Sequence, residues 1–159
     1  MKIRIYAIGK IKEQYLKDGI NEYLTRIRPY SQIEIVEVND EMIADNPHPS
    51  EIKKAIDIEG KRVIKLLKPN EYLIGLDLGK KEPNSEEFAE FLSKKFVLGG
   101  SNISFVIGGS YGLSDELKQR CNDSISLSKM TFLHQMTRLI LLEQIYRAFK
   151  INRNETYHK

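Results

Sequence analysis

ISFVIGGSYG, residues 103–112, joins a strongly apolar segment to a loop rich in glycine. An apolar run of this length, ended by turn residues, is typical of a strand that is buried on both faces of a sheet. A short helix pattern follows directly, from Ser114 to about Arg120. Ligands of open α/β sheets bind beyond the carboxyl ends of the strands, so the glycine loop lies where a ligand is expected.

Strand and helix patterns alternate on both sides of this segment. Further strand patterns occupy residues 2–9, 33–38, 72–78 and 124–128. Further helix patterns occupy residues 13–28, 50–68 and 85–98, and a last one begins between 131 and 134 and runs to about 151. The alternation predicts an α/β fold with a mostly parallel sheet flanked by helices, although it leaves the strand order open. No linker or repeat divides the sequence, so we expect one domain over residues 1–159.

The composition excludes several classes of protein. A single cysteine, Cys121, can form neither an internal disulfide nor a cysteine-rich zinc site. The three histidines show no HExxH spacing, so we expect no metal site. No apolar run approaches the roughly 20 residues of a membrane span, and the N-terminal MKIRIYAIGK lacks the apolar stretch of a signal peptide. We therefore expect a cytoplasmic protein that does not associate with membranes.

The net charge of +3 is unevenly distributed along the chain. Residues 1–28 carry +4, residues 29–128 carry −5 and residues 129–159 carry +4. If the two basic ends meet in the fold, they form one positive face that would attract a polyanion. The alternative, which charge alone favours, is two ordinary helices with solvated faces.

The glycine loop matches one catalytic motif and fails others. It contains neither GxxxxGK[ST] nor GxGxxG, which argues against a nucleotide phosphate loop. Gly108 to Gly112 does fit the G-x-S-x-G elbow of serine hydrolases, with Ser110 as nucleophile. Asp115 or Asp123, followed by His134, would complete a triad, although the chain is short for that fold. This alternative stays open at the level of motifs.

The segment from Ser126 to Phe149 has an unusual mixture of residues. Its first part is too polar for a central strand and too apolar for a free loop, and it leads into an amphipathic helix. We expect Met136, Leu139, Ile140 and Ile145 to pack inward. Arg138 lies on the same apolar helix, and we expect it to face a partner or a substrate. His134, at the start of the helix, is a candidate for capping or for catalysis.

Five segments, taken in order, resemble the ribosomal RNA large subunit methyltransferase H family, within the SPOUT class of knotted methyltransferases. These segments are MKIRIYAIGKIKEQY (1–15), LDLGKK (76–81), FVIGGSYGL (105–113), SLSKMTFLHQMTRLILLEQIYRAFKI (126–151) and YHK (157–159). The resemblance implies an α/β fold with a C-terminal trefoil knot, a homodimer, and S-adenosyl-L-methionine bound in the knot. It further implies methylation of N3 of a pseudouridine in the 23S rRNA of the assembled ribosome.

The resemblance also implies a cofactor site formed by three loops. Its residues here are Leu76, Gly108, Leu127, Ser128, Lys129, Met130, Thr131 and Phe132. The apolar members suit an adenine ring, and glycine lets the backbone close on the ribose and methionine portion. This use of the glycines displaces the serine-hydrolase alternative. Lys80 and Lys81 follow the first of these loops, and we assign them no role.

The catalytic residues that we expect from the resemblance lie in the last helix and the tail. His134, Tyr157 and His158 are candidates for the base or for orienting it, and Arg138 and Arg147 for holding phosphate or stabilising the nucleophile. We favour Arg138 and His158 for substrate contact. A dimer would allow the tail of one chain to complete the pocket of the other, and the sequence leaves open whether the tail acts within its own chain or across the dimer. The alternative for the tail is simple fraying.

Two other functions remain possible from the sequence. One is a ribosome-binding module without enzymatic activity, and the other is a methyltransferase for another RNA, such as tRNA.

Overall fold

The computed structural model describes residues 1–159 and is built around a five-stranded sheet in the order β2-β1-β4-β3-β5. All strand pairs are parallel. The strands are β1 (Lys2–Ile8), β2 (Gln32–Val38), β3 (Leu73–Lys81), β4 (Asn102–Ile107) and β5 (Asp123–Ile125). The helices are α1 (Gln14–Ile27), α2 (Pro49–Leu66), α3 (Ser85–Leu98), α4 (Asp115–Arg120) and α5 (His134–Asn152). The predicted α/β fold with a parallel sheet flanked by helices is confirmed.

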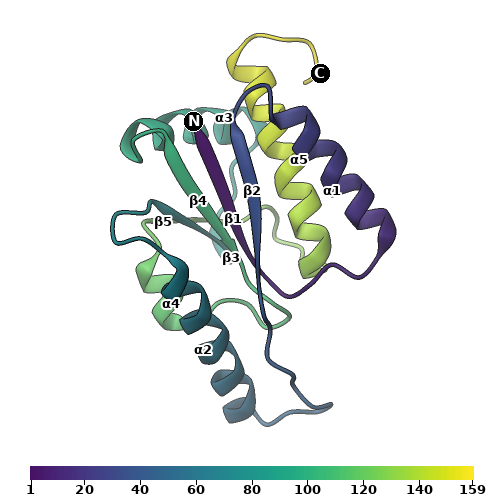
Figure 1. Ribbon diagram of the computed structural model, residues 1–159, viewed down its shortest axis with the longest axis vertical. Helices are drawn as coiled ribbons and strands as arrows, with labels where there is room; N and C mark the ends of the chain where they lie inside the picture. The colour runs from purple at the N-terminus through teal and green to yellow at the C-terminus, as the bar shows by residue number, and fades with distance from the viewer.

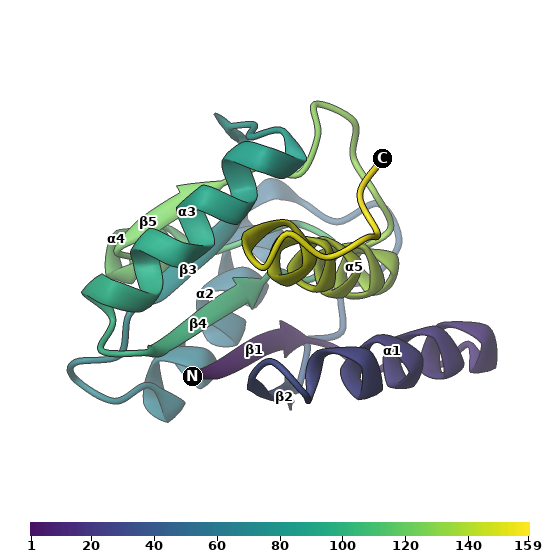
Figure 2. The ribbon, with the colours of Figure 1, turned by 90° about the horizontal axis from the view of Figure 1, so that it is seen from above.

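Helices cover both faces of the sheet. Because successive side chains of a strand point to opposite faces, Ile3 and Ile5 of β1 enter one core cluster while Tyr6 and Ile8 enter another. The first cluster includes side chains of α1, α3 and α5, and α5 lies between the other two helices (Figure 2). The second cluster lies beneath α2 and α4, on the other side of the sheet (Figure 1).

The α2 helix begins one position earlier than its sequence pattern indicates, whereas α3 begins at residue 85 as expected. The α2 helix is capped by His48, whose ring Nδ1 accepts a hydrogen bond from the Ser50 N–H at 3.1 Å. The α3 helix is capped by Asn84, and Asn84 and Glu87 form a capping box. Both helix starts therefore depend on a cap residue outside the predicted helix range.

The inner face of α5 differs from the expected one. Its buried residues are Arg138, Leu141, Leu142, Ile145, Ala148 and Phe149. Ile145 lies in the core as expected and Leu139 packs against it. Met136 and Ile140 are only half-buried and belong to neither core cluster, so the prediction is wrong for these two. The buried stripe runs at helical spacing from Arg138, which occupies a place in the interior that the sequence pattern assigns to apolar residues. No helix combines the length and the apolar character needed to cross a bilayer.

A polar network joins β1, β4 and the segment before β3. The carboxylate of Glu71 accepts hydrogen bonds from Tyr6 Oη at 2.8 Å, Ser104 Oγ at 2.5 Å and the Lys68 N–H at 2.9 Å. Arg4 lies 3.5 Å from the same carboxylate. Burial opposes ionisation of Glu71, but these hydrogen bonds hold its pKa below the ordinary value of 4.5.

Candidate functional site

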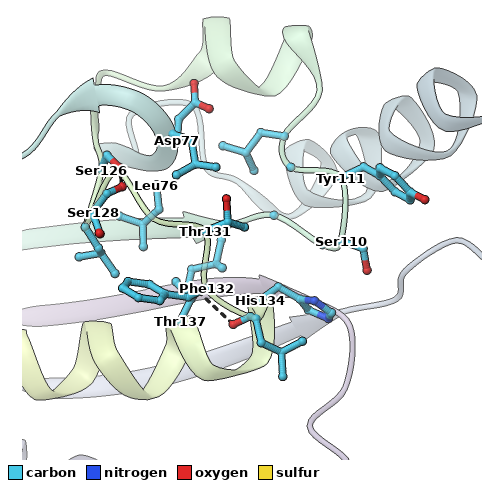
Figure 3. A pocket seen from close by; sticks show the side chains of 18 of the residues that line it. Leu76, Asp77, Ser110, Tyr111, Ser126, Ser128, Thr131, Phe132, His134 and Thr137 are labelled. Carbon is cyan, nitrogen blue, oxygen red and sulfur yellow. Dashed lines mark hydrogen bonds between the residues drawn. The ribbon is translucent and has the colours of Figure 1, made fainter. Parts of the chain in front are cut away.

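A pocket of about 770 Å³ opens at the carboxyl ends of β3, β4 and β5. Three chain segments and the first turn of α5 form its wall (Figure 3). They contribute Leu76–Leu78, Ile107–Leu113, Ser126–Ser128 with Met130–Leu133, and His134 with Thr137, and Lys118 completes the lining. This is the edge of the sheet at which the sequence predicts a ligand.

The loop after β4 folds back tightly on itself. A side chain at Gly108 would place its Cβ 2.6 Å from the Gly112 carbonyl carbon, so only glycine fits there. Gly112 has a φ of +86°, and its N–H donates a hydrogen bond to the Gly109 carbonyl at 3.1 Å. The loop therefore presents backbone, not side chains, to much of the pocket.

The segment between β5 and α5 is irregular but held by its own serines. Ser126 Oγ donates to the Ser128 carbonyl at 2.7 Å, and Ser128 Oγ accepts from the Met130 N–H at 3.0 Å. The Ser126 N–H donates to the Lys81 carbonyl at 2.8 Å, which fixes the segment beside the end of β3. The predicted fifth strand is thus shorter than expected, because its second half forms the pocket wall.

Most of the expected cofactor residues come together in this pocket. Those that line it are Leu76, Gly108, Leu127, Ser128, Met130, Thr131 and Phe132. Lys129 is the exception, since it lies exposed on the same segment and does not line the pocket.

His134 is the first residue of α5 and lines the pocket. Figure 3 shows it on the same side of the pocket as Ser110, with Ser126 and Ser128 at the other side. Burial lowers its pKa and the positive charge of Arg138 lowers it further, whereas Asp40 opposes the shift. The helix is capped at Leu133, so His134 has no capping role, and its imidazole is held in the neutral form that can accept a proton.

Arg138 does not face solvent, contrary to expectation. It is 1% exposed, and its guanidinium forms an ion pair with Glu37 at 2.6 Å. The same group donates to the carbonyls of Gly9 at 2.6 Å and Ile8 at 3.4 Å. Arg138 therefore ties α5 to the ends of β1 and β2, and its guanidinium is covered where RNA contact was expected.

The C-terminal tail is ordered, which argues against fraying. Tyr157 Oη donates to the Glu143 carboxylate at 3.0 Å, and the His158 ring lies 2.7 Å from Glu86 and 3.1 Å from Arg147. Neither Tyr157 nor His158 lines the pocket of its own chain. Arg147 lies more than three turns along α5 from His134, which is roughly 20 Å at 1.5 Å per residue. The structure thus separates the tail from the pocket.

The geometry disfavours the serine-hydrolase alternative. Ser110 is exposed and does not have the positive φ found at Asn46, Ser101 and Asn154. A nucleophile elbow instead holds its serine in a strained turn between strand and helix. No group of three or more His, Cys, Asp or Glu side chains is placed to hold a metal ion.

A family model described as "Predicted SPOUT methyltransferase" matches residues 1–158. The chain belongs to the SPOUT methyltransferase family. Membership implies the trefoil knot that the resemblance predicted. The crystal structure of a tRNA (m1G37) methyltransferase from Aquifex aeolicus shares this fold, with a TM-score of 0.51 over 92% of this chain and 70% of that chain, at 14% identity.

Similar proteins within the family share the whole length of this SPOUT methyltransferase. The chain is 51% identical over 159 residues to the "Ribosomal RNA large subunit methyltransferase H" of Carboxydothermus hydrogenoformans. It is 50% identical over 161 residues to the protein of the same name from Symbiobacterium thermophilum. Both alignments cover all of each chain.

Glu59 lies beside the SPOUT pocket, and its place there was not predicted from the sequence. It is 4% exposed and lies against Gly109 from behind the pocket. Its position follows Ile56 by three residues and precedes Val63 by four, which places it on the apolar face of α2. That spacing could have identified Glu59 as a buried carboxyl group.

Proposed function

We propose that this SPOUT methyltransferase transfers a methyl group from S-adenosyl-L-methionine to N3 of a pseudouridine in the 23S rRNA of the assembled ribosome. It acts as a cytoplasmic homodimer, and residues 1–159 form a single catalytic domain. The observation that carries the proposal is the pocket itself, which gathers nearly all the residues that the family resemblance assigns to the cofactor.

The pocket suits the cofactor in size and in chemistry. Its volume of about 770 Å³ lies in the range of roughly 300–1,000 Å³ that is usual for ligand sites. Leu76, Leu127 and Phe132 offer apolar surface for an adenine ring, and the Gly108–Gly112 loop offers backbone groups to the polar remainder. When bound, S-adenosyl-L-methionine supplies a methyl group already activated by its sulfonium.

The protein must then position the base and remove the imide proton at N3. Fixing two reactants in a near-attack geometry lowers a barrier by about 7–11 kcal/mol, and a general base typically adds about 10²–10⁴-fold. His134 is the best-placed base, because it lines the pocket and its lowered pKa keeps it neutral. Arg138 supports it from beneath, through its bonds to the ends of β1 and β2.

A dimer would complete the site. The rim of the pocket exposes large apolar side chains, at Leu78 (54%), Tyr111 (48%), Met130 (73%) and Leu133 (55%). Apolar patches of this kind mark interaction surfaces. Tyr157 and His158 of the same chain pack against Glu143, Arg147 and Glu86 and do not line the pocket, so we assign the substrate contacts to Tyr157 and His158 of the partner subunit.

The test is a methylation assay with radiolabelled S-adenosyl-L-methionine on four substrates. These are whole ribosomes, separated subunits, free rRNA and tRNA. We expect label in 23S rRNA from whole ribosomes, at N3 of a pseudouridine. Preferential labelling of tRNA would replace the proposed substrate. Calorimetry that detects no cofactor binding would favour a ribosome-binding module without enzymatic activity.

A further inference from the structure

Glu59 is the one buried acidic residue that lies against the glycine loop, Gly108–Gly112. A Cβ built on Gly109 would lie 3.5 Å from Glu59 Oε1 and 3.6 Å from Oε2, so the carboxyl group lies directly behind that loop. Its Oε2 also accepts a hydrogen bond from the Glu41 N–H at 3.0 Å. One side chain therefore contacts two separate segments, the glycine loop and residues 39–41.

Gly60, the next residue of α2, packs closely against Ser114, which follows the end of the same loop. A Cβ on Gly60 would lie 2.1 Å from Ser114 Oγ, so α2 can approach this closely only because position 60 is glycine. Ser114 caps α4 by accepting from the Leu117 N–H at 3.2 Å. Glu59 and Gly60 thus contact the glycine loop near its start and just after its end.

Residues 39–41 are fastened to α2 by two neighbouring side chains. Arg62 forms an ion pair with Glu41 and donates to the Asn39 carbonyl at 3.1 Å, while Glu59 binds the Glu41 N–H. Asp40, in the middle of this segment, is close enough to influence the protonation of His134. The segment is therefore bonded to Glu59, and the charge of its Asp40 acts on the proposed base.

We propose that Glu59 is a positioning residue for methyl transfer: its carboxyl group holds residues 39–41 and the glycine loop in a fixed relation, and so shapes both the cofactor pocket and the surroundings of His134. The inference rests on the proposed function. Burial raises the pKa of Glu59, and Asp40 and Glu41 raise it further, whereas the Glu41 N–H and Arg62 lower it. A glutamine matches the neutral form of this group in shape and can accept the same hydrogen bond.

The experiment compares Glu59→Ala, Glu59→Gln and the control Val63→Ala in the full chain. Val63 is fully buried one turn along the same helix, in the core beneath α2, and its apolar side chain makes no hydrogen bond to residues 39–41. For each variant, calorimetry gives the Kd for S-adenosyl-L-methionine, ribosome methylation gives kcat and KM, and a melting curve gives Tm. Glu59→Asp, which retains a carboxyl group but withdraws it by one methylene, replaces Glu59→Ala if that variant does not fold.

We expect Glu59→Ala to weaken cofactor binding by about tenfold or more and to lower kcat, because the Glu41 N–H loses its buried partner. Glu59→Gln should remain within about threefold of the unmodified protein in both quantities. Val63→Ala should lower Tm while leaving Kd unchanged.

Three outcomes would overturn the inference alone. The first is a Glu59→Ala variant that binds the cofactor and methylates as well as the unmodified protein. The second is a Val63→Ala variant that loses as much affinity as Glu59→Ala, and the third is a Glu59→Gln variant that binds as weakly as Glu59→Ala. If the unmodified protein binds no cofactor, the proposed function fails and the inference fails with it.

Discussion

At the residue scale, two side chains one helical turn apart, His134 and Arg138, lie at the start of α5 beside the pocket. His134 lines the pocket, and Arg138 lies buried beneath it with bonds to Glu37 and to the carbonyl of Gly9. A Cβ on Gly9 would be 3.8 Å from His134 Nε2 and 3.9 Å from an Arg138 terminal nitrogen, so both rest against the same turn of chain. The cation beside the imidazole disfavours protonation of His134.

We predict that Arg138→Met moves the acid limb of the methylation rate to higher pH. The lowered pKa of His134 keeps the base neutral in the unmodified protein, and removing the Arg138 charge lets it protonate at higher pH. The measurement is the single-turnover rate between pH 5 and 8. The control is Glu37→Gln, which retains the Arg138 charge, and an equal upward shift in that variant would contradict the assignment.

At Gly108 we predict that alanine severely impairs the pocket. Its Cβ would meet the Gly112 backbone at 2.6 Å, so the loop must move, at a cost of about 1–3 kcal/mol. We expect cofactor affinity to fall by about tenfold or more. Ser110→Ala, which removes one exposed hydroxyl from the pocket lining and leaves the loop backbone unchanged, is the matched control and should retain most of the affinity. Loss of activity in that control would revive the serine-nucleophile alternative.

At the scale of elements, the network around Glu71 fastens two strands of the sheet to the segment that precedes a third. It joins Tyr6 of β1 and Ser104 of β4 to the residues before β3. The side chain of Glu71 is only 9% exposed, so a substitution there would leave buried donors without a partner.

We predict that Glu71→Gln lowers the free energy of unfolding by about 1–3 kcal/mol at neutral pH. Because the folded-state pKa is depressed below 4.5, the ionised carboxylate stabilises the fold above that pH. This contribution is lost as pH falls through the folded-state pKa, so the two proteins should converge in acid. Urea unfolding between pH 7 and 3 measures the difference. Glu116→Gln, in an exposed ion pair, should change stability by less than about 0.5 kcal/mol.

At the scale of the whole molecule, the two basic ends of the chain do meet, since α1 packs along α5 (Figure 1). Many of their cations are neutralised by neighbours, as in the pairs Arg26–Glu22 and Arg147–Glu143. Lys10 and Lys12 are exposed and form no ion pair, and the Lys12 N–H contacts Gln135 at the start of α5. The cations free to meet RNA phosphates therefore include two beside the pocket.

We predict that the double variant Lys10→Ala/Lys12→Ala weakens ribosome binding and reduces its salt dependence. Each lost phosphate contact lowers the slope of log affinity against log salt by about one. Filter binding at several salt concentrations gives the slope. Lys53→Ala/Lys94→Ala, which removes cations already paired within helices, is the control and should leave the slope unchanged. An unchanged slope in the first variant would place the RNA elsewhere.

Mixed dimers test whether the tail acts across the interface. One subunit carries His134→Ala and the other lacks residues 157–159. If the tail completes the pocket of its partner, one of the two sites contains both an intact pocket and an intact tail. We expect activity near half that of the unmodified dimer, whereas a tail acting within its own chain would leave both sites defective.

The alternation of patterns predicted nearly every element, because periods of 2 and 3.6 follow from local geometry. It could not predict the strand order, which depends on contacts between distant segments, nor the knot, which general rules of topology exclude. Leu76, Gly108 and Phe132 were assigned through family resemblance and do meet in one pocket. Arg138 was misjudged because its partners, Glu37 and the turn at Gly9, are about a hundred residues or more away in sequence.

The position of α5 has a consequence for biosynthesis. This helix covers the face of the sheet that holds Ile3 and Ile5, yet the ribosome makes it after all five strands. At about 5–20 residues per second, α5 is synthesised several seconds after β1, so α5 cannot cover the apolar face of β1 during that time. During that interval the nascent chain offers a hydrophobic surface to chaperones, and the pocket cannot form before its last wall, the start of α5, has emerged.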